Sequence, residues 1–285
     1  FKQKTAYEIS LGLVGSEMCI RDRNLSTEKI IAKKVGKIAW MVINNPEKRN
    51  AISLSMREAM TQVFNEYDSD PEVRVLIIRG AGGKAFISGA DISEFKDIRS
   101  NYDAEEKYAK ATEIMTSAMN SFKKPILAMI EGYCVGGGVA TAIACDMRIA
   151  SHDTKYGIPA AKLGLAYNFD NLRQLVELVG PSNAKRILFT GDMLEADDAH
   201  RIGLVDEVCG TDELEAKVLS IADKISDNAP LTVLASKETV KHVLRPEIRD
   251  HQKLKDMAKV CFDSEDYKEG REAFMEKRKP DFKGR

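Results

Sequence analysis

Two glycine-bearing segments contain residue types that could stabilise a negative charge with main-chain groups. The first, residues 86–91, reads Phe-Ile-Ser-Gly-Ala-Asp, and the second, residues 132–138, ends in three consecutive glycines. Each segment follows strand-like sequence and precedes helix-like sequence. Glycines at such a junction let the backbone approach another group closely, and they leave N–H donors at the positive end of a helix. This suits an oxyanion that develops during a reaction, although tight helix packing also explains the glycines.

Metal and nucleotide sites lack support in the sequence. Neither glycine segment has the spacing of the GxGxxG or GxxxxGK[ST] phosphate-binding motifs. The four histidines form no HExxH or other ligand pattern, and the five cysteines contain no CxxC pair. We therefore predict no metal and no separate cofactor. The odd, widely spaced set of cysteines also argues against a disulfide framework and favours a reducing compartment.

The composition is that of a soluble globular protein. Of the 285 residues, 44% are hydrophobic and 31% are charged, and 43 Lys and Arg against 44 Asp and Glu give a net charge of -1. This balance provides no overall basic field for nucleic acid or an anionic membrane. The longest uncharged stretch, residues 132–145, is shorter than the roughly 20 residues that a membrane-spanning helix needs. We expect no nucleic-acid partner and no membrane partner.

The elements that must position the glycine segments begin with strands and an amphipathic helix. Two strand-like runs within residues 30–43 are separated by Gly36. A helix is predicted over residues 56–67, because apolar residues recur there at helical spacing. Ser55 and Glu58 have the spacing of a capping box, which predicts that Ser55 caps this helix.

Strands and helices continue to alternate further along the chain. A compact β-branched run at residues 73–78 predicts a strand, and an apolar stripe over residues 108–122 predicts a second long helix, after which Pro125 begins another strand. The alternation lasts to residue 208, which predicts an α/β fold class with crossover connections. Beyond it, residues 212–277 are predicted to be helices separated by prolines and a cap region.

We expect three parts in the chain. Residues 1–23 are predicted to be a non-native or disordered N-terminal segment, because they lack a clear apolar period and the regions of a signal peptide. Residues 24–210 are predicted to form the α/β core, and residues 211–285 a helical C-terminal region. We expect the protein to be cytoplasmic or to lie in the mitochondrial matrix.

The glycine segments and other motifs together resemble the crotonase superfamily, also called the enoyl-CoA hydratase/isomerase superfamily. The resemblance covers most of the chain, and its motifs occur in the family's order. They are Asn-Pro-Glu-Lys-Arg-Asn-Ala at residues 45–51, the two glycine segments at 86–91 and 131–138, Cys-Asp at 145–146, Thr-Gly at 190–191, and residues 199–204 and 264–282.

This resemblance implies a fold, a ligand and a reaction centre. The fold is a spiral of ββα units with a helical C-terminal region that helps to build trimers, often paired into hexamers. The ligand is a coenzyme A thioester of fatty acid metabolism, which is substrate rather than cofactor. By position, the N–H groups of Ala90 and Gly137 would form an oxyanion hole for the thioester oxygen as it becomes an enolate. Asp91 and Asp146 occupy positions that look structural, and we assign them no catalytic role.

The resemblance also implies contacts to the CoA moiety. Lys48 and Arg49 match the loop that contacts it, and Ala90 adjoins the same site. Phe274 and Lys277 match C-terminal residues that cover the CoA moiety, sometimes from a neighbouring subunit. Without the resemblance, Phe274 is equally explained as a core residue and Lys277 as a solvated lysine.

The sequence departs from the family's hydratases where those enzymes hold the water. They carry one glutamate two residues after the glycine triplet and another just after the proline of a later motif; here these positions are Ala140 and Ala160. A methyl group neither accepts nor donates a proton, so hydration by two carboxylates is not supported. We expect an apolar pocket near the acyl α-carbon, bordered by Val139, Ala140, Ile158, Ala160 and Leu165.

Decarboxylation of a malonyl-type thioester needs an oxyanion hole but no strong base, because loss of CO₂ generates the enolate directly. Tyr167 is the candidate proton donor, since residues 163–168 resemble the tyrosine segment of methylmalonyl-CoA decarboxylases of the family. Those decarboxylases have a histidine at the position of Ala90. Tyr167 is also explained as a wall aromatic whose hydroxyl bonds to the backbone. Asp170 is either an alternative acid or base or an exposed helix start.

Three functions remain open from the sequence. We favour a lyase that decarboxylates a malonyl-type CoA thioester. The first alternative is an enoyl-CoA isomerase or hydratase that uses a non-standard acid or base. The second alternative is a catalytically silent CoA-binding subunit or scaffold.

Overall fold

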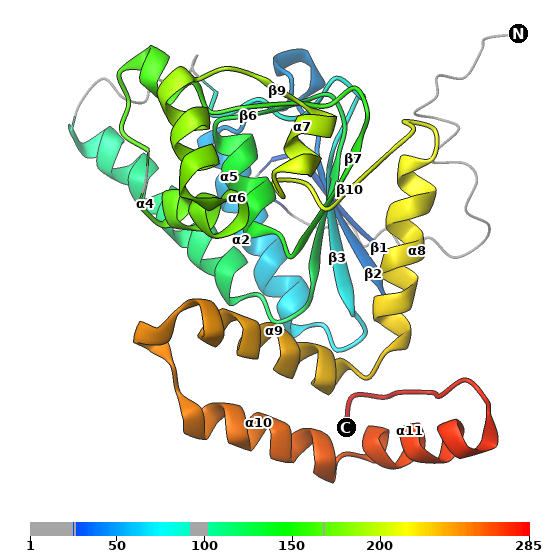
Figure 1. Ribbon diagram of the computed structural model, residues 1–285. Coiled ribbons are helices and arrows are strands. Elements are labelled where there is room, and N and C mark those ends of the chain that lie inside the picture. Colours follow the sequence, from blue (N-terminus) through cyan, green and yellow to red (C-terminus); the bar gives the residue numbers. More distant parts are fainter. Residues whose placement is uncertain (1–24, 26, 92–101, 168) are drawn as a thin grey trace, which may run out of the picture.

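Two β-sheets form the frame of the protein in the computed structural model, which describes residues 25, 27–91, 102–167 and 169–285. The larger sheet contains, in spatial order, β1 (Ile30–Val35), β2 (Ile38–Ile43), β3 (Val75–Gly80), β5 (Ile126–Ile130), β7 (Met147–Ser151) and β10 (Glu207–Cys209). The smaller contains β4 (Ala85–Ile87), β6 (Tyr133–Val135), β8 (Lys155–Gly157) and β9 (Leu194–Glu195). Figure 1 shows helices packed around these strands.

Helices connect the strands and make up the C-terminal region. Around the sheets lie α2 (Leu54–Ser69), α4 (Tyr102–Ser121), α5 (Gly137–Ala144), α6 (Phe169–Thr190) and α7 (Ala196–Arg201). The chain then continues as α8 (Leu214–Asp227), α9 (Pro230–Leu244), α10 (His251–Asp263) and α11 (Glu265–Glu276). Three short 3-10 helices are η1 (Pro46–Lys48), η2 (Pro159–Leu163) and η3 (Pro246–Ile248). The helices predicted after residue 211 are confirmed.

The strands and helices repeat as a spiral. In three successive turns, the first strand joins the larger sheet, the second joins the smaller sheet, and a helix follows: β3–β4–α4, β5–β6–α5 and β7–β8–α6. β3, β5 and β7 are parallel to one another, as are β4, β6 and β8. The predicted α/β fold of ββα units is confirmed.

Both faces of the larger sheet are buried, which explains its uninterrupted apolar runs. Alternate residues of β2 and β3 point to opposite faces. One set belongs to the main core, which also includes residues of α2, α5 and α6. The other set packs against one face of α8 in a second cluster, whose buried members are Ile38, Trp40, Val75, Ile77, Leu127, Met129, Ile149, Leu214, Val218 and Ala222. The core therefore fixes the larger sheet from both sides and holds the turns of the spiral in register.

The first long helix begins two residues earlier than the capping-box pattern predicts. Its N-cap is Ser53, whose Oγ accepts a hydrogen bond from the N–H of Met56 at 3.2 Å. The prediction that Ser55 is the cap was wrong, because Leu54 already has helical geometry and Ser55 lies within the first turn. Ser55 Oγ instead lies 3.1 Å from Ser53 Oγ.

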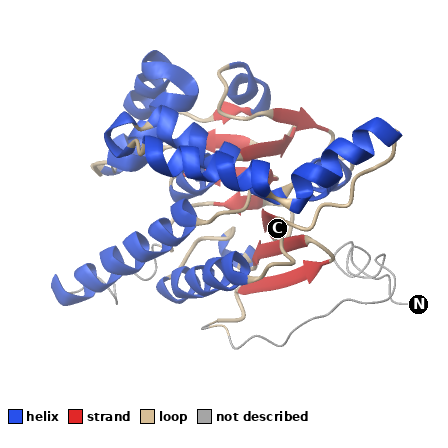
Figure 2. Ribbon diagram, turned by 90° about the horizontal axis from the view of Figure 1, so that it is seen from below, coloured by secondary structure: helices blue, strands red, loops and turns tan. Residues whose placement is uncertain are grey.

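α9, α10 and α11 lie together on one side of the spiral core (Figure 1), and the view from below looks onto them (Figure 2). α9 is fastened to the core by Lys237, whose Nζ lies 2.8 Å from both Asp146 Oδ2 and the carbonyl oxygen of Lys124. Asp146 Oδ2 also accepts the N–H of Ile126 at the start of β5. α10 packs against α9, and α11 continues beyond it from the N-cap Ser264. Asp146, which the sequence suggested to be structural, thus holds α9 against the sheet.

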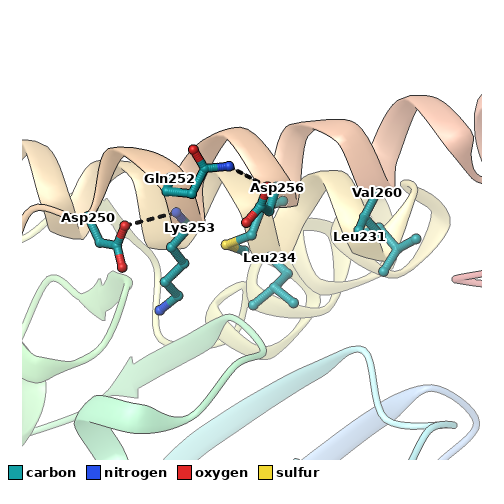
Figure 3. A pocket seen from close by; sticks show the side chains of 8 residues that line it. Leu231, Leu234, Asp250, Gln252, Lys253, Asp256 and Val260 are labelled. Atoms are coloured by element: carbon teal, nitrogen blue, oxygen red, sulfur yellow. Dashed lines mark hydrogen bonds between the residues drawn. The ribbon is translucent and has the colours of Figure 1, made fainter.

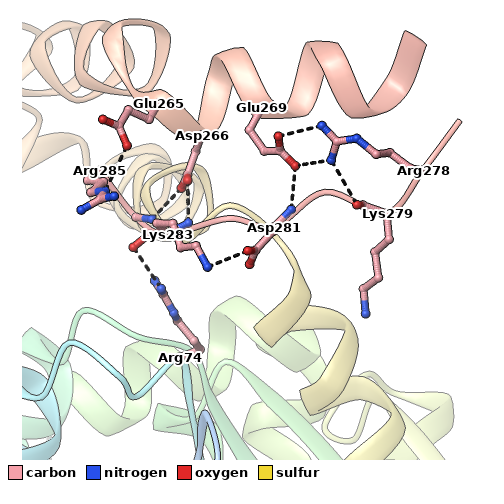
Figure 4. A network of polar contacts seen from close by, with 10 residues as sticks. Arg74, Glu265, Asp266, Glu269, Arg278, Lys279, Asp281, Lys283 and Arg285 are labelled. Carbon is pink, nitrogen blue, oxygen red and sulfur yellow. Dashed lines mark hydrogen bonds and ion pairs between the residues drawn. The ribbon is translucent and has the colours of Figure 1, made fainter. Parts of the chain in front are cut away.

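A network of polar contacts folds the C-terminal tail back onto α11 (Figure 4). The buried carboxylate of Asp266 accepts the N–H groups of Lys283 and Gly284 at 2.7 and 2.8 Å. Glu269 accepts two hydrogen bonds from the guanidinium of Arg278 and one from the N–H of Asp281. These contacts hold the pKa of Glu269 far below its usual value, at about 2, with the Arg278 hydrogen bonds as the largest cause.

The low pKa of Glu269 predicts a pH-dependent stabilisation of the tail. The folded pKa is lower than that of an unfolded chain, so the ionised carboxylate stabilises the fold above about pH 4.5 and loses this effect as the pH falls towards 2. We expect Glu269→Gln to lower the melting temperature at pH 6, with the difference from wild type shrinking steadily below pH 4. Scanning fluorimetry over a pH series measures this, with the exposed Glu272→Gln as control. A constant difference from pH 6 to pH 3 would contradict the prediction.

Candidate functional site

The three consecutive glycines at the start of α5 have three different structural roles. Gly136 is the N-cap and has φ 54° and ψ -109°, a backbone conformation that suits glycine. Gly138 packs against β4 so closely that an added Cβ would lie 2.0 Å from the carbonyl oxygen of Ile87. Gly137 stands in the first helical position, where the N–H has no acceptor within the helix. Tight packing therefore explains Gly138, and Gly137 presents a main-chain donor.

Ala90 presents a second main-chain donor beside the first. Ile52 forms a parallel bridge with Ala90, in which the Ile52 N–H donates to Gly89 O at 2.9 Å and the Asp91 N–H donates to Ile52 O at 3.0 Å. This pattern leaves the Ala90 N–H directed away from Ile52. β4, which leads into this segment, pairs along its other edge with β6, the strand before Gly137. The N–H of Ala90 is thus on the edge that faces α5.

The donors of Ala90 and Gly137 lie next to each other. A Cβ built on Gly137 would be 4.0 Å from the Ala90 nitrogen and 3.7 Å from Gly89 Cα. The structure therefore brings together the two glycine segments that the sequence singled out. Two amide N–H groups beside a helix N-terminus favour an anionic oxygen.

The nearby thiols are not nucleophiles. Cys134 lies in β6 and Cys145 follows α5, and both are fully enclosed in the core. Burial raises the pKa of the Cys134 thiol and raises that of Cys145 to about 12. Both sulfurs therefore stay protonated near neutral pH, where only the thiolate is an effective nucleophile. The chemistry of this region must come from other groups.

The loop that contains Lys48 and Arg49 packs behind the Ala90 segment. Lys48 Nζ forms an ion pair with Asp91 Oδ2 at 2.8 Å, and the Arg49 guanidinium lies 5.3 Å from the centre of the Tyr133 ring. Asn50 is fully buried with φ 58°, and its Nδ2 donates to carbonyl oxygens on both sides of the β3–β4 turn. No local sequence pattern signals the Lys48–Asp91 pair, because the partners are 43 residues apart.

Tyr167 is largely buried between η2 and α6. Its side chain packs against the main core, and within the described part of the chain its hydroxyl has no hydrogen-bond partner. The alternative that this hydroxyl bonds to the backbone is therefore wrong. Burial raises the pKa of Tyr167 above its ordinary value, with a smaller contribution from Cys134. The phenol stays protonated at neutral pH and can donate a proton.

The residues of the predicted apolar wall differ in how deeply they are buried. Val139 and Ile158 are each 1% exposed and belong to the core, and Ala140 and Ala160 are half-buried. Leu165 is 56% exposed, so its predicted place in the wall is corrected: it lies on the surface of the turn after η2. No carboxylate stands at position 140 or 160, and the methyl groups there can only pack.

Asp170 lies at the exposed start of α6. Its carboxylate forms an ion pair with Arg173 at 3.0 Å, and Arg173 also pairs with Glu247 of η3 at 3.0 Å. The side chain of Asp170 is 60% exposed. Two interpretations of Asp170 were made from the sequence. The structure agrees with the exposed helix start, because the carboxylate does not point inward.

Phe274 and Lys277 lie at the end of α11, which packs mainly against α10. Within one chain the structure does not bring them to Ala90 and Gly137. The phenyl ring of Phe274 is 82% exposed, so its interpretation as a core residue is wrong. It borders an open cavity of about 690 Å³ between the end of α10, α11 and the start of α9.

A further groove of about 400 Å³ separates α9 from α10 (Figure 3). Its walls combine apolar side chains such as Leu231, Leu234 and Val260 with polar ones from the start of α10. Asp250 caps that helix by accepting the N–H of Lys253 at 2.9 Å. The groove thus lies within the C-terminal helices and apart from the paired amides.

None of the helices within 27–91, 102–167 and 169–285 is long and apolar enough to cross a membrane. Across the same part of the chain, no three His, Cys, Asp or Glu side chains gather in a way that could hold a metal ion.

The chain is similar in sequence to known proteins over most of its length. The sequence description of the enoyl-CoA hydratase/isomerase family matches residues 33–285. The chain is 36% identical to the short-chain-enoyl-CoA hydratase of Clostridium acetobutylicum, covering 90% of this chain and 97% of that protein. It is also 36% identical to the crotonyl-CoA hydratase of Syntrophomonas wolfei, covering 90% of this chain and 99% of that protein.

Solved structures show the same similarity. An enoyl-CoA hydratase/carnithine racemase from Magnetospirillum magneticum superposes with a TM-score of 0.86 and 33% identity, covering 91% of this chain and 97% of that chain. An enoyl-CoA hydratase from Bacillus anthracis gives a TM-score of 0.82 at 28% identity, covering 90% and 100% of the two chains. With the family match spanning most of the sequence and the spiral fold in common, this chain belongs to the enoyl-CoA hydratase/isomerase family.

Proposed function

We propose that this enzyme stabilises the enolate of an acyl-CoA thioester at the N–H groups of Ala90 and Gly137, and that its reaction is decarboxylation of a malonyl-type thioester. The observation that carries the proposal is the pair of adjacent main-chain donors, in a chain that has alanine at both positions 140 and 160. The family resemblance locates the water-holding glutamates of hydratases at these two positions. The proposed site therefore favours a reaction that needs an oxyanion hole and no carboxylate base.

The proposed reaction has two steps. In the first, the bond between the α-carbon and the carboxylate breaks and CO₂ leaves. The electron pair of that bond remains with the substrate and forms the enolate. The negative charge gathers on the thioester oxygen, where the two N–H groups stabilise it more strongly than the neutral carbonyl. In the second step, Tyr167 donates its proton to the α-carbon and recovers one from solvent. Burial raises the pKa of Tyr167 and makes the phenol a weaker acid than usual. The α-carbon of an enolate is still far more basic than a phenolate, so the proton transfer is downhill.

The half-buried methyl groups would assist the first step. An ionised carboxylate next to Ala140 and Ala160 finds no hydrogen-bond donor in either side chain. Transfer from water to such surroundings raises the energy of the carboxylate more than that of the neutral CO₂ it becomes. The proposal thus uses both alanines as a wall with no acid or base function.

Turnover of methylmalonyl-CoA tests this function. We expect the purified protein to release propionyl-CoA and CO₂, detected by chromatography of the CoA esters. Tyr167→Phe should lower kcat about tenfold, because water replaces the phenol as a slower proton donor. Its stability should change little, since the hydroxyl has no partner within the described residues to lose. Absence of propionyl-CoA with wild-type protein would exclude this decarboxylation.

The names of the relatives favour a second candidate, an enoyl-CoA hydratase or isomerase with a non-standard acid or base. Asp170 is then the carboxylate to test, although it is exposed and paired with Arg173. Crotonyl-CoA turnover that is lost in Asp170→Asn would support this candidate. Unchanged turnover in that variant would exclude Asp170. Binding of CoA esters without turnover across a panel of thioesters would instead indicate a silent CoA-binding subunit.

We also propose that the chain assembles as a homotrimer or homohexamer through its C-terminal helices. Large apolar side chains are exposed on α9, α10 and α11, and a monomer in water gains nothing from their exposure. They are Val240, Val243, Leu244, Val260, Phe262, Phe274 and Met275. Sedimentation of the purified protein as a monomer at micromolar concentration would contradict this assembly.

A further inference from the structure

We propose that Lys48 is a positioning residue for the reaction: its ammonium neutralises the buried carboxylate of Asp91 and so keeps that negative charge from opposing the enolate at Ala90. This inference rests on the proposed function, because it concerns the same oxyanion hole. It differs from the role that the family resemblance gives Lys48, which is contact with the CoA moiety. The two roles predict different kinetic effects.

The carboxylate belongs to the residue next to one of the two proposed oxyanion donors. Asp91 follows Ala90 in the chain, and its side chain is only 6% exposed. The Asp91 N–H donates to Ile52 O at 3.0 Å, which fixes the backbone of this residue. Lys48 Nζ lies 2.8 Å from Asp91 Oδ2, while the Lys48 side chain remains 46% exposed. One member of the pair is thus buried near the reaction, and the other reaches it from the surface.

The backbone holds Lys48 in place independently of its side chain. The carbonyl oxygens of Lys48 and Arg49 accept hydrogen bonds from Ser88, through Oγ at 3.3 Å and N–H at 3.2 Å. Asn50 anchors the same loop by donating to Ala85 O at 2.7 Å. Substitution of the Lys48 side chain therefore removes a charge and leaves these main-chain contacts intact.

Coulomb repulsion gives the size of the effect. A buried carboxylate that has lost the charge of the Lys48 ammonium repels more strongly a second negative charge that forms on the neighbouring thioester oxygen. For any two unit charges roughly 8 Å apart, at an effective dielectric constant of about 20, Coulomb's law gives a repulsion that slows a reaction about thirtyfold. The repulsion acts on the charged enolate and much less on the neutral thioester, so it lowers kcat more than it raises KM.

A double-mutant cycle tests this assignment. We expect Lys48→Met to lower kcat for methylmalonyl-CoA about thirtyfold, and Asp91→Asn in the same chain to restore kcat to within about threefold of wild type. The matched control is Lys84→Met, an exposed lysine on the neighbouring β3–β4 turn. Melting temperatures of all variants show whether folding contributes. A double variant as slow as Lys48→Met, or a loss confined to KM, would overturn the inference.

A binding experiment separates this inference from the proposed function. The probes are a CoA thioether that carries a nitronate, which mimics the enolate charge, and CoA itself. We expect Lys48→Met to weaken binding of the nitronate probe more than binding of CoA, as measured by calorimetry. Adding Asp91→Asn should restore the wild-type ratio of the two dissociation constants. If this holds without turnover of methylmalonyl-CoA, the decarboxylase fails and the inference stands. If turnover occurs and the ratio is unchanged in Lys48→Met, the inference fails. Wild-type protein that binds neither probe would overturn both.

Discussion

Gly137→Pro is expected to lower kcat for the thioester substrate by about 10²- to 10³-fold. Proline has no N–H, so the substitution removes one of the two proposed oxyanion donors. Gly137 occupies the first position of α5, where proline is tolerated because that N–H has no helical acceptor. The loss should appear in kcat, since the donor acts on charge that forms in the transition state. Steady-state kinetics with methylmalonyl-CoA provides the measurement.

Gly137→Ala is the matched control for this variant. It keeps the N–H, and the added methyl group finds its nearest neighbour, Gly89 Cα, at an ordinary 3.7 Å. We expect it to retain most of the wild-type kcat. Ala90→Pro removes the other donor. It leaves the bridge to Ile52 in place, because the hydrogen bonds of that bridge involve Gly89 and Asp91. We expect this variant to lower kcat as well. A folded Gly137→Pro enzyme with wild-type kcat would show that this N–H does not act on the substrate.

Gly138→Ala is expected to lower the free energy of unfolding by about 3 kcal/mol. Its Cβ would lie 2.0 Å from the carbonyl oxygen of Ile87 and 2.9 Å from the carbonyl carbon, so α5 and β4 must separate. Ile87 is fully buried, and the backbone cannot move without disturbing the core. The displacement would also shift the Gly137 N–H from the Ala90 N–H, so activity should fall with stability.

The neighbouring glycine again supplies the comparison. Gly137→Ala adds the same methyl group one residue earlier and should remain within about 0.5 kcal/mol of wild type. Thermal melting of the two variants under one set of conditions measures the contrast. Equal melting temperatures would mean that α5 has room to shift away from Ile87, and the packing role of Gly138 would then be rejected.

Local sequence patterns predicted much of the fold. The strands within residues 30–43 pair as an antiparallel hairpin around Gly36, consistent with the two strand-like runs that this glycine separates. The apolar stripe of α2 is buried as predicted, since helical spacing places those residues on one face. The start of α2 was harder to predict, because Ser53 and Ser55 are both good caps and only their hydrogen bonds distinguish them.

The candidate site was predictable where its parts are main-chain groups in short motifs. The structure brings the two glycine segments together, and positive φ and close backbone approach restrict the residue type at several of their positions. The bridge between Ile52 and Ala90 and the ion pair between Lys48 and Asp91 were not predictable, since both join distant residues through the tertiary fold. For the same reason, the sequence could not determine whether Phe274 lies near the site or remains exposed.

α5 and η2 belong to separate turns of the spiral, and this affects how the protein can change through mutation. Ala140 and Ala160 stand on different connections, whereas the paired N–H groups belong to the polypeptide itself. A codon change replaces a side chain and leaves an amide in place, except where it introduces proline. If the proposed site is right, single substitutions on either connection can change the type of reaction between descendants, while the proposed anion-binding N–H groups are inherited with the path of the chain.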